Sequence, residues 1–168
     1  MKSFALTPLQ NADLEHLSAR DCALLLNNAR VLQRAAEPSR MQVLLRGRKL
    51  ALLCESEQGA DAALFRRAAT DLGAHVSHVW PCLADLSAPD ELEHTAKMLG
   101  RLYDAIECQG LPRALVAVVD REAGVPVYDG LASLRHPTAR LAALLGDAED
   151  ATKSRELVVQ TALVSTLS

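Results

Sequence analysis

The sequence predicts an α/β fold, in which a single doubly wound domain holds about four parallel strands flanked by helices. The first observation behind this prediction is that short apolar runs alternate along the chain with stretches of helical spacing, an order typical of parallel βαβ units. The second is the length of 168 residues, which suits one domain with a normal core. The third is a composition of 49% hydrophobic and 23% charged residues, as in an ordinary globular protein.

Four segments are the predicted strands. The clearest is Leu50–Cys54, a continuous apolar run after a glycine turn, and such a run is typical of a strand buried on both faces. The other three are more mixed in composition, and a glycine or proline lies beside each of them. They cover residues 75–80, 103–108 and 125–128.

Helices are predicted between these strands and at both ends of the chain. One or two amphipathic helices are expected over residues 9–36, where leucines recur among charged positions. Gly73 closes a helix over residues 62–72 as its C-cap. Further helices are predicted over residues 90–102, 112–123 and 137–145, and residues 155–168 are predicted to form an amphipathic terminal helix.

Charge and cysteine usage exclude several classes of function. The formal net charge of −3 gives no support to binding of nucleic acid or of an anionic membrane, and the basic run 46–49 is interpreted as a solvated turn. The four cysteines form none of the close Cys/His pairs that zinc requires. Because the sequence shows neither a signal-peptide pattern nor an apolar run of membrane-spanning length, we expect a cytoplasmic protein without a metal or other cofactor.

Three stretches of the sequence resemble the ornithine carbamoyltransferase family. They are similar, in order, to the family's first strand, phosphate loop and helix, to the helix that leads into its third strand, and to the strand and loop that bear its His-Pro-Thr-Gln motif. The first consists of Gly47–Glu55 followed by Leu64, Phe65 and Ala68–Val76, the second of Thr95–Ile106, and the third of Ala123–Leu131 with His136–Thr138. The spacing between them is that of the family, so the resemblance is more specific than a lone motif.

The end of the chain resembles a distant part of the same family. Ser154–Leu167 is similar to the last helix of full-length members, which returns to pack against the first domain. The resemblance therefore implies the carbamoyl-phosphate-binding N-terminal domain of an ornithine or aspartate carbamoyltransferase together with this C-terminal helix, with the amino-acid-binding domain missing. On this interpretation residues 1–147 form the domain, 148–154 a connector and 155–168 a helix that packs back on it. An unrelated amphipathic helix is the alternative.

The positions that should hold carbamoyl phosphate have lost their cations. The family grips this dianion with a Ser-Thr-Arg-Thr-Arg loop at a helix N-terminus, an arginine after the third strand, and the histidine and glutamine of His-Pro-Thr-Gln. The corresponding loop residues here are Gln58, Gly59, Ala60, Asp61 and Ala62. Gln109 replaces the later arginine and Ala139 the motif glutamine, so that only His136 remains.

Electrostatics predicts that this degenerate site contains no catalytic residue. Three arginines are lost and one aspartate is gained, which shifts the formal charge of the site by four units toward negative. A carboxylate about 4 Å from a bound anion repels it by roughly 4 kcal/mol at an effective dielectric constant of 20. We hypothesise that Asp61 instead caps the helix where the phosphate would bind.

Several residues near this site have two possible interpretations. Arg135, His136 and Arg140 flank a predicted helix start and are candidate contacts for some residual anion; alternatively, the arginines point to solvent and His136 bonds the backbone. Trp80 either anchors a partner or packs on the core or its rim. The loop 83–89, which the resemblance implies would reach a neighbouring subunit, is acidic and lacks the expected polar pair or lysine.

These observations argue against carbamoyl transfer by this chain alone. The first hypothesis is a non-catalytic module for oligomeric assembly or regulation, and the resemblance implies a homotrimer or an assembly with an intact carbamoyltransferase. The second is a sensor that binds a neutral or cationic small ligand around Gln58, Gln109 and His136. The third is a transferase subunit with residual carbamoyl phosphate binding.

Overall fold

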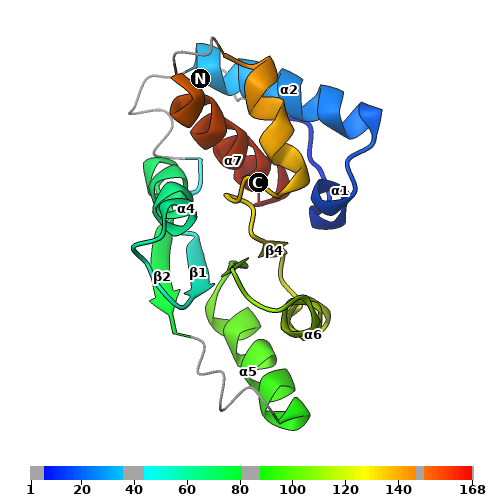
Figure 1. Cartoon of the computed structure of the whole chain (residues 1–168), viewed down its shortest axis with the longest axis vertical. Helices are drawn as coiled ribbons and strands as arrows, with labels where there is room; N and C mark the ends of the chain where they lie inside the picture. The colour runs from blue at the N-terminus through cyan, green and yellow to red at the C-terminus, as the bar shows by residue number, and fades with distance from the viewer. Residues whose placement is uncertain (1–5, 36–43, 81–87, 147–149, 168) are drawn as a thin grey trace.

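A computed structural model describes residues 6–35, 44–80, 88–146 and 150–167 of the chain. The fold is α/β and is built on a four-stranded, all-parallel sheet in the order β2-β1-β3-β4 (Figure 1). This architecture confirms the predicted fold class. The strands are β1 (Lys49–Cys54), β2 (His75–Val79), β3 (Ala105–Gln109) and β4 (Val127–Asp129).

The central strand β1 separates two hydrophobic cores. Alternate side chains of a strand point to opposite faces of the sheet, so Leu50 and Leu52 join the core on one face and Ala51 and Leu53 the core on the other. All four residues are buried. This two-sided burial is the reason why β1 reads as a continuous apolar run.

Two of the strands start two residues later than predicted. Tyr103 is the C-cap of the preceding helix, and Asp104 accepts a hydrogen bond from the backbone N–H of Lys49 at 2.7 Å, so strand β3 begins at Ala105. Strand β4 begins at Val127, directly after Pro126. Pro126 has no N–H to donate to a neighbouring strand, although its carbonyl oxygen accepts a hydrogen bond from the backbone N–H of Ile106.

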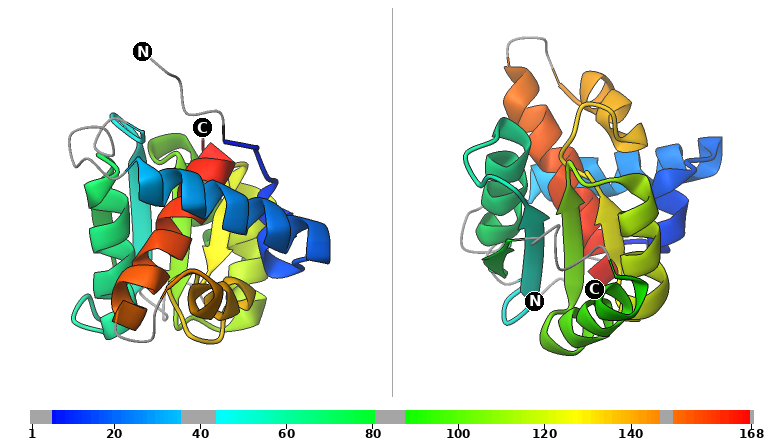
Figure 2. Two further views of the ribbon diagram at one scale, coloured as in Figure 1. Left: turned by 90° about the horizontal axis from the view of Figure 1, so that it is seen from above. Right: turned by 60° about the horizontal axis from the view of Figure 1, so that its bottom comes forward.

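Helices cover both faces of the sheet, as a doubly wound fold requires (Figure 2). Helices α5 and α6 contact each other and lie on one face, where their apolar residues share a core with β1 and β3. Helices α4 and α7 lie on the other face, with α2 and the 3-10 helix η2 packed against α7. The bounds are α1 Asn11–Glu15, α2 Ala19–Arg34, α4 Ala60–Asp71, α5 Pro89–Leu102, α6 Arg113–Ala123, η2 Pro137–Leu144 and α7 Ala151–Leu167.

The terminal helix α7 is not amphipathic, contrary to the prediction. Every residue from Val158 to Ser165 is buried, because α7 contacts α2, α4 and η2 together and passes between α2 and the sheet (Figure 2). Its polar groups have partners in this interior: the Ser165 hydroxyl accepts a hydrogen bond from the Asn28 amide at 3.0 Å. The helix also begins at Ala151, inside the predicted connector.

Within the described residues, no helix combines the length and the hydropathy needed to cross a membrane.

Candidate functional site

The carboxyl ends of three strands form the candidate site. Helix α4 follows β1 on one face of the sheet and α6 follows β3 on the other, so a topological switch point lies between these two strands. Ligands of open α/β sheets bind at such a point. The register places Cys54 of β1 beside Gln109 of β3, and Cys108 of β3 beside Asp129 of β4.

The loop between β1 and α4 has no free cation to offer an anion. Gln58 is exposed, and its backbone N–H donates to the Ser56 hydroxyl at 3.2 Å. The Glu57 carboxylate accepts a hydrogen bond from the Arg66 guanidinium. Its Oε1 atom also lies 2.7 Å from Nδ1 of His78. The nearby basic groups are therefore engaged by a carboxylate of the same loop.

Asp61 does not cap helix α4, so that hypothesis is wrong. The N-cap is Gly59, which has extended backbone angles and makes no side-chain hydrogen bond. Asp61 lies two residues after this N-cap, in the first turn, where its carboxylate accepts a hydrogen bond from the Gln109 amide at 3.4 Å. A negative charge in the first turn interacts favourably with the helix dipole, which explains why the position tolerates it.

The degenerate positions of the predicted phosphate site are brought together in space. Gly59, Ala60, Asp61, Ala62 and Gln109 line one hollow of about 320 Å³ beside the end of β1. The groups that Asp61 and Gln109 present there are a carboxylate and an amide, and the Gln109 Oε1 atom is buried without a hydrogen-bond partner among the described residues. The negative charge of the Asp61 carboxylate would repel an anion in this hollow.

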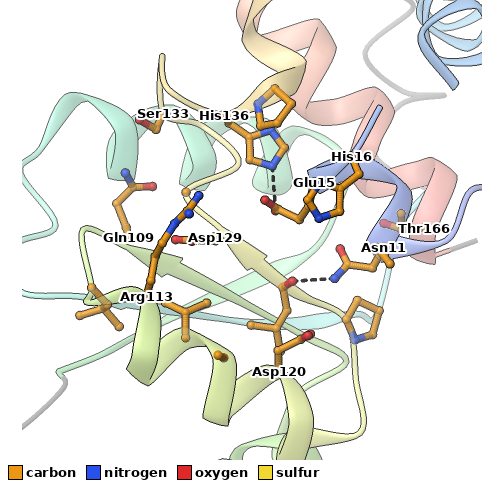
Figure 3. A pocket seen from close by; sticks show the side chains of 18 of the residues that line it. Asn11, Glu15, His16, Gln109, Arg113, Asp120, Asp129, Ser133, His136 and Thr166 are labelled. Atoms are coloured by element: carbon orange, nitrogen blue, oxygen red, sulfur yellow. Dashed lines mark hydrogen bonds and ion pairs between the residues drawn. The ribbon is translucent and has the colours of Figure 1, made fainter. Parts of the chain in front are cut away.

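His136 is enclosed and both of its ring nitrogens are engaged, and Figure 3 shows its bond to Glu15. Its side chain is 0% exposed, and it forms the N-cap of η2: the backbone N–H of Thr138 donates to Nδ1 at 3.2 Å. Since Nδ1 accepts this bond, Nε2 carries the proton and donates to Glu15 Oε1 at 3.1 Å. Burial alone would raise the pKa of Glu15, but hydrogen bonds from His136 and the Asp129 backbone hold that pKa below its usual value.

The other predicted anion contacts do not converge on His136. Arg135 is exposed at the edge of a larger cavity that His136 also lines. Arg140 lies outside that cavity, because the turn of η2 directs it to helix α2, where it donates to Cys22 Sγ at 3.5 Å. Ala139 also lies outside the cavity lining.

The larger cavity has a volume of about 1480 Å³ and brings together carboxylates that the sequence reasoning missed (Figure 3). Glu15 comes from α1, Asp120 from α6 and Asp129 from the end of β4. Burial, and then the charge of Glu15, raise the pKa of both Asp120 and Asp129. Of these three carboxylates, only Asp129 could have been singled out from the sequence, because it directly follows a predicted strand. Glu15 and Asp120 lie far apart in the sequence, and no pattern connects them.

Glu107 is a further residue to which the sequence reasoning assigned no role. It is 0% exposed in the middle of β3, and Oε2 accepts a hydrogen bond from the backbone N–H of Leu131 at 3.3 Å. Burial raises its pKa well above the usual value, although hydrogen bonds from the backbone of Leu131 and Ala132 oppose this. Glu107 thereby holds the start of the loop that leads to His136.

Comparison with known sequences identifies the family of this domain. The family model described as aspartate/ornithine carbamoyltransferase, carbamoyl-P binding domain, matches residues 10–146. The chain belongs to this family. The match covers all residues of the smaller hollow and most of those that line the larger cavity, and it confirms the resemblance seen in the sequence.

Individual carbamoyltransferases show the same relationship. The catabolic ornithine carbamoyltransferase of Pseudomonas putida is 36% identical over 132 residues, which are 79% of this chain and 39% of the relative. The ornithine carbamoyltransferase of Actinobacillus pleuropneumoniae serotype 5b is 37% identical over 134 residues, which are 80% of this chain and 40% of the relative. The chain thus spans about two fifths of the length of these carbamoyltransferases.

Solved carbamoyltransferases share the fold. The ornithine carbamoyltransferase from Pyrococcus furiosus has a TM-score of 0.63 and 26% identity, covering 86% of this chain and 46% of that chain. The catalytic subunit of M. jannaschii aspartate transcarbamoylase has the same TM-score of 0.63 at 19% identity, covering 83% of this chain and 45% of that chain, and shows likeness of fold alone.

The sequence predicted that the loop 83–89 lacks the polar pair or lysine of the family. Residues 83–87 of this loop lie outside the described residues.

Proposed function

We propose that this chain is a degenerate carbamoyltransferase-like domain that does not bind carbamoyl phosphate at the family position and acts as a non-catalytic module for assembly or regulation. The observation that carries the proposal is the pair formed by Asp61 and Gln109 at the N-terminus of α4. These two residues occupy positions where the family resemblance implies a threonine and an arginine.

The chemistry of carbamoyl transfer supports this proposal. The protein must hold a dianionic leaving group and polarise a carbonyl oxygen, mostly by preorganised positive charge and N–H groups. Here the carboxylate of Asp61 would repel that dianion by roughly 4 kcal/mol at about 4 Å. His136, the single family contact retained, donates to Glu15 and has no free nitrogen to offer the ligand.

The proposed partners are other copies of this chain, in a homotrimer, or an intact carbamoyltransferase. This part of the proposal rests on the family to which the chain belongs. We further propose a cytoplasmic location, which agrees with the free thiols of Cys22, Cys54 and Cys108.

The test is a calorimetric titration of the purified protein with carbamoyl phosphate at low salt. We expect no saturable heat from the wild type. The matched variant combines Ala60→Arg, Asp61→Thr and Gln109→Arg, which restores two of the three lost arginines and removes the aspartate, and we expect it to gain binding. Saturable binding by the wild type would overturn the proposal and favour a transferase subunit with residual carbamoyl phosphate binding.

A second candidate function is a sensor for a neutral or cationic small ligand. It is favoured by the unpaired Gln109 Oε1 atom and the Asp61 carboxylate beside the smaller hollow, since both are hydrogen-bond acceptors. A thermal-shift screen of amides and amines tests it. A stabilising hit that Asp61→Ala abolishes would support the sensor, and a screen without hits would remove it.

A further inference from the structure

His78 of β2 connects its strand to the loop between β1 and α4, and it has no role in the function proposed above. Strand β2 lies beside β1 at the edge of the sheet (Figure 1). The His78 ring reaches two oxygen atoms on the side of β1: Nε2 lies 2.8 Å from the carbonyl oxygen of Cys54, and Nδ1 lies 2.7 Å from Oε1 of Glu57. The side chain of His78 is 19% exposed, so water reaches little of the ring.

Both partners of the His78 ring are hydrogen-bond acceptors. A backbone carbonyl oxygen has no proton to donate, and an ionised carboxylate only accepts. A neutral imidazole carries one N–H group, so it donates to one of the two oxygens and turns a lone pair toward the other. The doubly protonated imidazolium donates to both oxygens, and the geometry therefore fits the charged form of His78.

Two charged groups act on this ring among the described residues. Glu57 is in direct contact with it, and the second carboxylate oxygen of Glu57 accepts a hydrogen bond from the Arg66 guanidinium of α4 at 2.5 Å. The Glu57 carboxylate thus lies between two cations when His78 is charged, and it pairs with Arg66 alone when His78 is neutral. The ring of Trp80, edge-on at 6.3 Å between the centroids, carries no charge.

The loop that His78 holds also forms a wall of the smaller hollow. Among the residues that line this hollow are Cys54, Glu55, Ser56 and Gly59. Loss of the His78 proton leaves one of its two acceptors without a donor, which is costly for an acceptor that water does not reach. The Glu57 side chain is 43% exposed and can turn to water, whereas the Cys54 carbonyl is fixed at the end of β1. The bond to Glu57 is therefore the one that breaks.

We propose that His78 and Glu57 form a pH-dependent clamp that holds the loop between β1 and α4 against β2 and so sets the shape of the smaller hollow. The clamp is closed while the imidazole is charged and the carboxylate is ionised. It opens as the pH rises through the range in which histidine titrates, about pH 5 to 8. A molecule that enters the hollow therefore meets a wall whose position depends on pH.

The experiment follows the full chain, labelled with the heavy nitrogen isotope, by NMR between about pH 5.5 and about pH 8. At the lower pH we expect two N–H proton signals from the His78 ring, because the hydrogen bonds at Nδ1 and Nε2 protect both protons from exchange with water. As the pH rises, we expect the Nδ1 proton signal to disappear and the backbone signals of Ser56, Gln58 and Gly59 to shift together with it.

Two substitutions remove the pH dependence in different ways. His78→Gln replaces the titrating ring by an amide, so the loop signals are expected to lose their shift with pH. In Glu57→Gln the new amide group donates to Nδ1 of the neutral ring, which keeps both of its bonds, and the loop signals are again expected to lose their shift. His75→Gln is the matched control, because His75 is exposed at the start of the same strand; its loop signals should shift as in the wild type.

A single ring N–H signal from His78 at the lower pH would overturn the inference. Loop signals that shift with pH equally in the wild type, His78→Gln and Glu57→Gln would overturn it as well. The carbamoyl phosphate titration changes neither residue of the clamp, so the two proposals fail separately.

Discussion

At the scale of single residues, the carboxylates decide the character of this domain. Asp61 places a negative charge at the position predicted to hold phosphate, and Glu15 pairs with His136, the one predicted contact that is retained. Glu107 differs from both because it lies in the core of the sheet, 0% exposed, with Oε1 unpaired among the described residues. A buried carboxylate is costly to ionise, so Glu107 links the stability of the domain to pH.

Replacement of Glu107 by glutamine tests this link. The pKa of Glu107 is raised in the folded protein, so above its ordinary pKa the unfolded chain releases a proton that the folded chain retains. The free energy of unfolding therefore falls as pH rises from the ordinary pKa toward the raised one. We expect urea unfolding to show that Glu107→Gln gains stability relative to the wild type between about pH 5 and about pH 8. Glu91→Gln on the surface of α5 is the control, and parallel pH profiles of the wild type and Glu107→Gln would contradict the prediction.

At the scale of elements, close packing between helices decides which small residues are required. Gly100 of α5 lies against the end of α6, and a Cβ atom added to it would be 1.8 Å from the carbonyl oxygen of Ala123. No side chain fits at that distance, because the neighbouring atom belongs to the backbone of Ala123 and cannot rotate away. Gly100 therefore allows α5 and α6 to pack together over one face of the sheet.

Gly100→Ala is expected to lower the free energy of unfolding by about 1–2 kcal/mol. Overpacking costs about 1–3 kcal/mol, and the better helix propensity of alanine returns up to about 1 kcal/mol of this. Chemical denaturation measures the difference. His94→Ala, at an exposed position of the same helix, is the control and should change stability by less than about 0.5 kcal/mol. Equal stability of Gly100→Ala and the wild type would show that the two helices separate without cost.

At the scale of the whole molecule, the proposed assembly requires surfaces that a single chain leaves exposed. Trp80 is the single tryptophan of the sequence, and it is 65% exposed where β2 ends. This exposure corrects the interpretation that Trp80 packs on the core. Among the aromatic residues described, its ring is near that of His78 alone, in a T-shaped arrangement with 6.3 Å between the ring centroids. A large exposed aromatic side chain is a suitable anchor for a subunit contact.

Trp80 provides its own measurement of assembly. We expect tryptophan emission to shift to longer wavelength on dilution, as a subunit contact that covers the ring dissociates. Trp80→Ser should raise the dissociation constant of the assembly by roughly tenfold or more in sedimentation experiments. Leu102→Ser, at a leucine that is 57% exposed on α5, is the control. Emission independent of concentration, with unchanged mass of the Trp80 variant, would exclude Trp80 from the contact.

The sequence by itself determined the fold class, the four strands and the family. The loss of phosphate-binding cations at Gln58–Ala62 and Gln109 is a prediction from the same source. These features depend on local periodicity and on residues at fixed spacing, which a sequence displays directly. It also placed strand β1 accurately, because burial on both faces leaves a continuous apolar run.

Only the tertiary structure decided how α7, His136 and the carboxylates are arranged. The burial of α7 on nearly all sides depends on contacts with α2, α4 and η2, which its own sequence does not record. The pairing of His136 with Glu15 joins residues 121 positions apart, and the cavity collects Asp120 and Asp129 from separate elements. Contacts between distant segments arise from packing of whole elements, so their charge and burial follow from the fold and not from the order of the residues.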